Sequence, residues 1–280
     1  MSATRMRRLL RSPVAWIALV FLTLIISGAI LGPSLSQWDS EAMDFAAMQS
    51  APSSVHWFGT DLVGRDQFVR TMLGARVSLS VALIAISVSL LIGIPWGIAA
   101  ALAGGRWDQL MMRIVDILYG LPVILIVILL VVIFGRNQYL LFAALGAFFW
   151  LDIARIVRGQ TLRLREAAFI QAARMLGSGP LYTLRHHILP NIAGPVIVYA
   201  TLAIPGIILA ESFISFLGLG VQEPDTSWGV LVADGAQTLE SAPWLLLYPG
   251  LCLGVTIWSF NTLGDRLRDT LDNVDNRAPD

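Results

Sequence analysis

Lysine is absent from this chain of 280 residues, and cysteine and histidine are scarce, with one and three copies. A phosphate-binding loop of the GxxxxGK[ST] type needs a lysine, so the chain cannot bind ATP in that manner. The single cysteine, Cys252, excludes an internal disulfide framework and a site built from several cysteine ligands. Charged residues make up 14% of the chain, against about a quarter in an ordinary soluble domain, so the polar surface of a soluble monomer is missing.

Hydrophobic residues, in contrast, make up 56% of the chain, and 19 basic and 19 acidic residues balance to a formal net charge of zero. This composition indicates a membrane protein and argues against binding to nucleic acid or another polyanion. A helix crosses the bilayer with roughly 20 mostly apolar residues. The runs with little or no charge predict an all-α membrane protein with six transmembrane helices, at 14–31, 77–103, 117–135, 138–151, 192–216 and 240–265.

Two of these runs have a second interpretation. Arg5, Arg7, Arg8 and Arg11 precede the first run, as in a signal peptide, but its length and the five later runs favour a retained helix. The fourth run is short and reaches full length only if Asp152 and Arg155 lie inside the end of the helix.

The arginines also predict the orientation, because cytoplasmic segments of membrane proteins are enriched in basic residues. Threading the six runs with the N-terminus inside puts fifteen of the nineteen arginines in the cytoplasm, so both termini are expected there. The chain is then divided into an N-terminus (1–13), a first helix (14–31), an extracytoplasmic loop or cap (32–76), a five-helix core (77–264) that contains a cytoplasmic loop (155–191), and a cytoplasmic tail (265–280).

The external segment 32–76 is too long for a simple turn between helices. It contains His56-Trp57-Phe58-Gly59-Thr60-Asp61, followed by Gly64-Arg65-Asp66. A solvated loop is one interpretation, and the aromatic pair with its flanking glycines favours the other, a folded cap at the membrane surface.

The internal loop 155–191 is too polar to cross the bilayer, yet its apolar residues keep a helical period. Ala168, Ala172, Met175 and Leu176 can share one helix face, and 177–180 (Gly-Ser-Gly-Pro) predicts the end of that helix. A second short helix can follow over 181–188, before Pro190 and Asn191 lead into the fifth span. This hairpin favours docking to a cytoplasmic partner, with an interfacial hairpin on anionic lipid as the alternative.

A few polar residues lie within the predicted spans, where burial against lipid is unfavourable. Glu211 is the deepest of them and either lines a substrate path, forms a hydrogen bond between helices or marks a helix end. Trp150 and Asp152 are further candidates for the path, although Asp152 can also pair with Arg155, and Asp116 with Arg113 in the same way. His186 and His187 are adjacent and point about 100° apart on a helix, so no metal site is predicted.

The internal loop also carries a spaced pattern of small and apolar residues. Gln171-Ala172-Ala173 is followed after three residues by Gly177 and after nine more by His187-Ile188-Leu189-Pro190. This pattern resembles the "EAA" loop of ABC-importer permease subunits. Gln171 stands where that family usually has glutamate, a difference that removes one charge. The triplet 166–168 (Glu-Ala-Ala) does not fit, because its spacing to the glycine is wrong.

The similarity extends over nearly the whole chain, to the C-type permeases of oligopeptide and dipeptide importers. The segments that carry it are His56–Asp61, Gly64–Asp66, Gly74–Leu79, Arg113–Asp116, Ser215–Gly220, Ser227–Gly229, Ala242–Trp244 and Asn261–Asp269. The resemblance implies the type I ABC-importer permease fold and a place in a bacterial inner membrane. It also implies that residues 166–190, with Gln171, Ala172, Ala173, Gly177, His187, Leu189 and Pro190, couple the chain to a cytoplasmic ATPase.

The same resemblance implies the partners. The chain would form a heterodimer with a B-type permease, two ATP-binding subunits would dock below, and an extracytoplasmic binding protein would deliver peptide. No cofactor is expected on this chain, since ATP and Mg would be used by the ATPase subunits. A permease for nickel chelates or another small solute is the nearest alternative. More distant ones are an ion-driven transporter and an intramembrane hydrolase that uses a serine with His56, His186 or His187, for which no GxSxG element is present.

Overall fold

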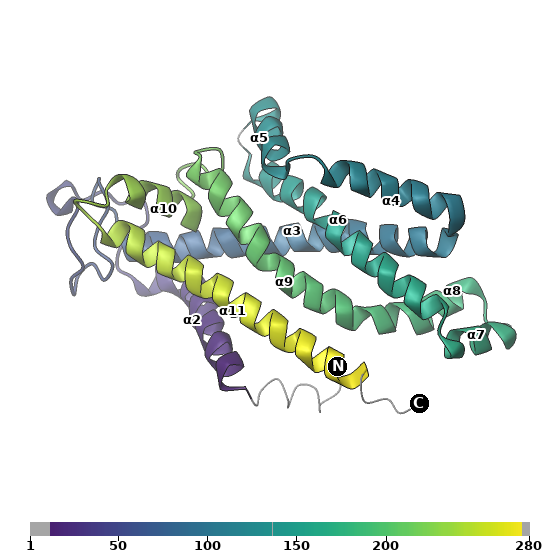
Figure 1. The fold of residues 1–280 in the computed structure, drawn as a ribbon. Coiled ribbons are helices and arrows are strands. Elements are labelled where there is room, and N and C mark those ends of the chain that lie inside the picture. The colour runs from purple at the N-terminus through teal and green to yellow at the C-terminus, as the bar shows by residue number, and fades with distance from the viewer. Residues whose placement is uncertain (1–11, 136, 276–280) are drawn as a thin grey trace.

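The computed structural model describes residues 12–135 and 137–275, and these ranges are mostly helical, as Figure 1 shows. Within them the only β-type pairing is an isolated bridge between Thr60 and Asp66. The predicted all-α fold class is therefore confirmed. Most of the predicted N-terminal segment 1–13, with its four arginines, lies outside the described residues, as do Arg136 and Arg277.

Five helices are long and the others are short. The long helices are α2 (Pro13–Leu35), α3 (Gln67–Ala103), α6 (Gln138–Arg165), α9 (Leu189–Phe216) and α11 (Trp244–Asp275). The short ones are α4 (Gly105–Tyr119), α5 (Val123–Phe134), α7 (Ala168–Met175), α8 (Pro180–Thr183) and α10 (Trp228–Gln237). A 3₁₀ turn, η1 (Phe45–Ala47), and a π-helical turn, η2 (Leu184–Ile188), complete the described elements.

The number of spans differs from the six predicted. Four continuous helices are long and apolar enough to cross a membrane, namely α2, α3, the helix over Pro180–Phe216 and α11. The pair α4 and α5 makes a fifth only if the two are one broken span, because they are bent by 77°. The remaining predicted span lies in α6, which continues through Asp152 and Arg155 to Arg165 and is apolar only at its start.

The predicted third span, 117–135, is wrong as a single helix. Its first residues form the last turn of α4, the chain turns at Gly120 and Leu121, and α5 starts only after Pro122. Proline disfavours the helical conformation of the residue before it, here Leu121, so charge-free sequence does not guarantee continuous helix.

Helix α3 begins ten residues before the predicted start at 77. Its N-cap is Asp66, whose carboxylate accepts a hydrogen bond from the backbone N–H of Val69 at 2.9 Å. Arg70 and Arg76 lie inside the helix because each finds polar partners within the protein. Charge therefore did not mark the helix boundary here.

Arg76 joins α3 to the part of α2 that precedes Pro33. Pro33 lacks an N–H group and cannot donate to the carbonyl of Ala29, four residues earlier. The Arg76 guanidinium donates to that carbonyl from Nε and Nη2, at 3.1 and 3.0 Å, and to the carbonyl of Ile30 at 3.3 Å. A side chain on one helix thus supplies the hydrogen bond that proline removed from the other.

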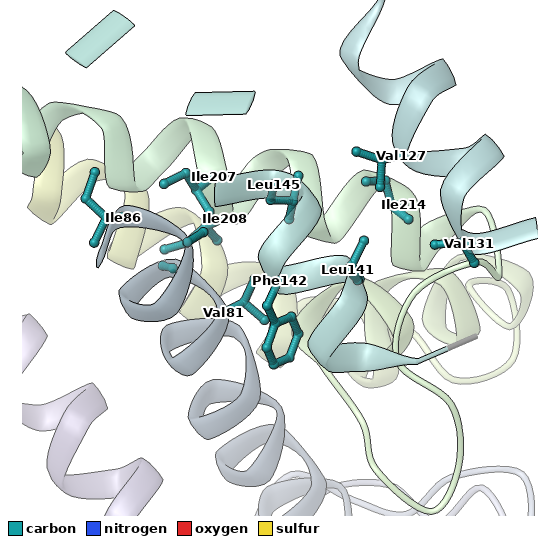
Figure 2. Close-up of a cluster of buried hydrophobic side chains, with 12 residues drawn as sticks. Val81, Ile86, Val127, Val131, Leu141, Phe142, Leu145, Ile207, Ile208 and Ile214 are labelled. Carbon is teal, nitrogen blue, oxygen red and sulfur yellow. The ribbon is translucent and has the colours of Figure 1, made fainter. Parts of the chain in front are cut away.

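Helices α3 and α6 form the centre of the molecule and approach each other closely. A Cβ atom on Gly97 would lie 2.5 Å from the carbonyl oxygen of Ala154, and one on Gly93 would lie 2.8 Å from that of Trp150. In earlier turns of both helices, apolar side chains from α3 and α6 join others from α5 and α9 in a buried cluster, which Figure 2 shows around Phe142 and Leu145. Small and apolar residues together fix the crossing of these helices.

The two ends of this helical body differ in structure. Residues 36–66 and α10 gather at one end, and α7 and α8 extend from the other, with α3 and α11 running between them (Figure 1). Helix α2 packs against α3 and α11. Residues 36–66 are called the cap below, and residues 166–190 the coupling segment.

Candidate functional site: the coupling segment and the polar residues of the spans

The coupling segment starts directly after α6 and folds back into α9. Helix α7 ends in a Schellman motif, in which Gly177 donates to the carbonyl of Arg174 and Ser178 to that of Ala173, both at 3.0 Å. Gly177 has a φ of +87°, a value that favours glycine. The helix break that the sequence predicts at 177–180 is found here.

The second short helix of the segment does not end before the fifth span. Residues 180–216 form one continuous helix, in which α8 passes through the π-helical turn η2 into α9. Pro190 lies in the first turn of α9 and lacks an N–H group, and Leu189 donates to the carbonyl of Leu184 in the wider π pattern. The predicted entry through Pro190 and Asn191 is therefore a helical joint, and the side-chain amide of Asn191 donates to the carbonyl of His187 at 2.6 Å.

Two isoleucines anchor the coupling segment to the rest of the chain. Ile170 in α7 and Ile188 in η2 are fully buried in one cluster with Ile98, Ile153 and Val157. Large apolar side chains of the segment also face outward, among exposed polar ones such as Arg174: Met175 is 91% exposed and Leu176 88%. Phe169, Leu181 and Tyr182 are also exposed. An apolar surface of this kind on a rigidly anchored hairpin is typical of a docking site.

The residues of the predicted coupling pattern lie along this hairpin. Gln171 and Ala172 are exposed, Ala173 is half-buried, and Gly177 forms the joint. His187 is half-buried in η2, next to the rings of Phe169 and Tyr182, and Leu189 and Pro190 are exposed at the start of α9.

Gln171, the departure from the family pattern, has a structural use in this chain. Its amide Nε2 donates to the backbone carbonyl of Glu166 at 3.1 Å, across the turn between α6 and α7. A glutamate carboxylate has no proton to donate to a carbonyl when ionised, so it could not make this bond.

Glu211 is fully buried where α3, α9 and α10 meet. Ser78 and Ser212 donate to its Oε2 at 3.2 and 3.4 Å, and Ser215 donates to Oε1 at 2.7 Å. The backbone N–H of Trp228 donates to the Ser78 hydroxyl at 3.2 Å. In this structure Glu211 therefore forms the hydrogen bonds between helices that were one of its three predicted roles, and it does not face an open cavity.

The other two candidates for the path lie in α6 and differ in exposure. Trp150 is buried and meets the ring of Trp96 edge-on, with 5.2 Å between ring centroids. Asp152 is exposed. Arg155 makes its ion pair with Asp116 on α4 at 2.9 Å and stacks on Tyr119, rather than pairing only within its own helix as the sequence predicts.

Comparison with known proteins assigns the chain to a family. Residues 93–273, more than half of the chain, match the family described as binding-protein-dependent transport system inner membrane components. The chain belongs to this family. Residues 3–52 match a second description, the N-terminal transmembrane domain of oligopeptide transport permease C. The chain is thus a multi-pass inner-membrane permease, as the sequence predicts.

Several relatives of this permease are similar over almost their full length. The chain is 48% identical to the oligopeptide transport system permease protein OppC of Escherichia coli K12, covering 96% of this chain and 90% of that protein. It is 46% identical to OppC of Haemophilus influenzae, over 96% and 87% of the two chains. It is 43% identical to the dipeptide transport system permease protein DppC of Bacillus subtilis, over 95% and 83%.

A solved structure shows the same fold. The inward-facing MetNI methionine ABC transporter contains a chain that matches with a TM-score of 0.60 and 19% identity, over 72% of this permease and 96% of that chain. This match confirms the predicted type I ABC-importer permease fold. Permeases of this class work with membrane-embedded permease partners and with ATPase subunits.

The cap of the permease holds a polar network that the sequence did not reveal in detail. Asp61 accepts hydrogen bonds from Arg65 at 2.7 Å and from the buried Arg70, and Arg65 also pairs with Glu223 at 2.9 Å. Burial opposes ionisation of Asp61, but the charge of Arg70 and the hydrogen bonds from Arg65 outweigh it and lower the pKa of the carboxyl. These side chains line a cavity of about 290 Å³ together with Asp234.

A second buried pair completes the cap. His56 Nδ1 lies 2.9 Å from Asp66 Oδ2, and the ring of Trp38 stacks on the imidazole with 4.5 Å between centroids. Phe58 stacks on Tyr248 of α11 at 4.0 Å. Of the two interpretations of this segment, the folded cap agrees with these contacts and the solvated loop does not. Its charged and aromatic residues were visible in the sequence, whereas their pairing was not.

Proposed function

We propose that this chain is the C-type permease subunit of an ATP-driven importer of oligopeptides or dipeptides. The observation that carries the proposal is the similarity over 95–96% of the chain to permeases named for oligopeptide and dipeptide transport. The buried, self-contained helical core and the exposed coupling segment are what such a subunit requires. The chain contributes half of the pathway, and a B-type permease contributes the other half.

In this proposal the coupling segment docks in a cleft of an ATPase subunit. Its exposed apolar side chains, above all Met175 and Leu176, supply the contact, and the buried Ile170 and Ile188 transmit the partner's movement to α6 and α9. A rigid element seated in a moving partner displaces the helices to which it is attached. Gln171, Ala172, Ala173, Gly177, His187, Leu189 and Pro190 are accordingly assigned to coupling.

The energy comes from two ATPase subunits, which bind ATP and Mg, and the permease itself hydrolyses no ATP and binds no cofactor. Both termini lie in the cytoplasm on the same side as the coupling segment, an orientation supported by the six arginines between 155 and 185. The cap then lies outside, where a peptide-binding protein delivers its substrate. Asp152, exposed on α6, is the candidate that fits a wet path best, while Glu211 and Trp150 support the path from the packed interior.

Uptake into proteoliposomes tests this proposal. The chain is reconstituted with its partner permease, both ATPase subunits and its peptide-binding protein. Uptake of labelled peptides of different lengths is compared with uptake of a nickel chelate. We expect peptide uptake that stops when ATP is withheld at a constant ion gradient. Uptake of the nickel chelate but of no peptide would favour a permease for nickel chelates. Uptake without ATP would favour an ion-driven transporter.

A further inference from the structure

Two arginine–aspartate pairs join α4 to α6, and they differ in strength. Arg158 binds Asp108 through two hydrogen bonds, Nε to Oδ1 at 2.5 Å and Nη2 to Oδ2 at 2.6 Å. Arg155 binds Asp116 through one, at 2.9 Å. The side chains of the first pair are 32% and 11% exposed, and those of the second 37% and 53%. A bidentate pair whose carboxylate is largely buried fixes geometry better than a single contact to an exposed carboxylate.

The stronger pair lies at the start of α4, which follows the end of α3 after a single residue, Gly104. Asp108 lies in the first turn of that helix, just after the turn at Gly104 and Gly105. Of the residues in α4, all of which the structure describes, only Asp108 and Val115 are buried. Val115 packs on Trp150 and Leu151 of α6, so it holds the second half of α4. The first half of α4 is held to α6 by the carboxylate of Asp108.

Another arginine of α6 binds the neighbouring helix end. Arg165, the last residue of α6, donates through Nη1 to the carbonyl of Ala101 in the last turn of α3. Carbonyls in the last turn of a helix have no partner within that helix. The end of α3, the start of α4 and the last two turns of α6 are thus tied together by Arg158 and Arg165.

This assembly lies immediately before the coupling segment. Only Glu166 and Ala167 separate Arg165 from α7, and the backbone of α3 touches α6 at Gly97. A displacement of α7 therefore acts directly on α6, as it acts on α9 through the continuous helix 180–216, and the pair of Arg158 with Asp108 passes the movement of α6 to α4. At its other end α4 leads to the 77° bend before α5.

We propose that Arg158 and Asp108 are positioning residues for coupling: they make α4 move with α6 when an ATPase partner displaces the coupling segment, so that the movement reaches the bend between α4 and α5. This inference rests on the proposed import function. Without the pair, α6 still follows the coupling segment, but the start of α4 slips and the pathway no longer opens in step with ATP hydrolysis.

The test compares matched substitutions at the two pairs. Asp108→Asn and Arg158→Gln are reconstituted in the complete importer, with Asp116→Asn and Arg155→Gln as controls on the same two helices. The readouts are ATP hydrolysis stimulated by the peptide-loaded binding protein and peptides taken up per ATP. We expect uptake per ATP to fall about tenfold at the first pair, with stimulated hydrolysis retained, and to change less than about twofold at the second.

Two further measurements separate positioning from simple loss of folding. The exchanged pair, Asp108→Arg with Arg158→Asp, should recover a large part of the uptake per ATP, because the contact is restored with reversed charge. Spin labels are placed on α4 and α6 through the exposed positions Leu110→Cys and Gly159→Cys, in a chain that carries Cys252→Ala. The distance between the two labels should stay constant through the ATP cycle. With Asp108→Asn added, the distribution of that distance should broaden.

The outcomes distinguish failure of the proposed import function from failure of the positioning role of Arg158 and Asp108. A wild-type importer that takes up no peptide contradicts the proposed function and not the pairing. A wild-type importer that works, with Asp108→Asn as well coupled as Asp116→Asn, overturns the positioning role. Loss of assembly in the single variants that the exchanged pair does not reverse overturns it as well.

Discussion

The cap and the coupling segment lie at opposite ends of the permease and differ in which side chains they bury and which they expose. In the cap, buried polar and charged residues find partners within the chain, as His56 does with Asp66 and Asp61 with Arg70 of α3. In the coupling segment, large apolar residues face outward, with Met175 and Leu176 almost fully exposed. The polar groups of the cap are paired within the described part of the chain, whereas the coupling segment exposes large apolar side chains, on which the proposed docking to an ATPase rests.

This contrast separates residues that stabilise the fold from residues that are expected to act on assembly with other subunits. Residues of the cap stabilise the permease, so their replacement should act on folding whether or not other subunits are present. Exposed residues of the coupling segment contribute little to folding and should act on assembly with the ATPase. The predictions below test this contrast, from the largest expected effect on stability to the smallest.

Arg70→Met removes the buried partner of Asp61. We expect the free energy of unfolding to fall by about 3–5 kcal/mol, because the buried carboxylate of Asp61 loses one of its two cationic partners. Thermal unfolding of the purified importer, followed by tryptophan fluorescence, measures the change. Arg266→Met is the control, since the Arg266 side chain is 46% exposed and lies 3.8 Å from Asp269. Equal effects of the two substitutions would show that the cap network is not a folding element.

Arg76→Met removes the donor that replaces the missing N–H of Pro33. The buried carbonyl of Ala29 then has no hydrogen-bond donor. We expect the free energy of unfolding to fall by about 1–3 kcal/mol. Pro33→Ala restores the backbone donor, so the double substitution should be less harmful than the sum of the two single ones. Additive effects in this double-mutant cycle would contradict the assignment.

Gly177→Ala tests the joint of the coupling segment. A Cβ at this position meets no atom within 4 Å, so the effect comes only from the φ of +87° and should be about 1–2 kcal/mol, local to the joint. Gly179→Ala is the control: Gly179 has equal space and a φ of −66°. We expect reduced peptide uptake for Gly177→Ala alone, with unchanged amounts of both variants in the membrane.

Leu176→Ser should change the free energy of unfolding by less than about 0.5 kcal/mol, since the side chain is exposed. Binding of the purified ATPase subunit should nevertheless weaken about tenfold, as for an apolar anchor of an interface. Leu239→Ser makes the same replacement at an exposed position near the cap end. An equal loss of ATPase binding at both positions would remove the distinction between the two ends.

The sequence predicted the helices best where a local signal sets their ends. Helix α7 ends just before Gly177, whose positive φ is a backbone conformation that glycine adopts more readily than other residues. The turn at Gly104 and Gly105 likewise separates α3 from α4. Apolar runs predicted the first, second, fifth and sixth helices, although α3 starts earlier and α11 ends later than expected.

The errors arose where a contact distant in sequence decides the outcome. The second span was expected to start at 77, after the charge of Arg76, but Arg76 lies inside α3 because the carbonyl of Ala29 on another helix accepts its hydrogen bonds. Asp116 was expected to pair with Arg113 on its own helix, and it pairs with Arg155 of α6. Pairing of Asp108 with Arg158, fifty residues later, has no local signature at all.

By itself the sequence determined that the chain is a helical membrane protein with a polar hairpin between its fourth and fifth apolar runs. Composition, hydrophobic period and the residues at turns are local quantities, and they suffice for that result, whereas the permease function was implied by the resemblance of its motifs to a known family. Only the tertiary structure decided that Glu211 is enclosed by serines, that Asp61 of the cap pairs with Arg70 of α3 and that α4 is tied to α6 above the coupling segment. A buried polar group must find a partner wherever the fold supplies one, and the fold places that partner on another helix.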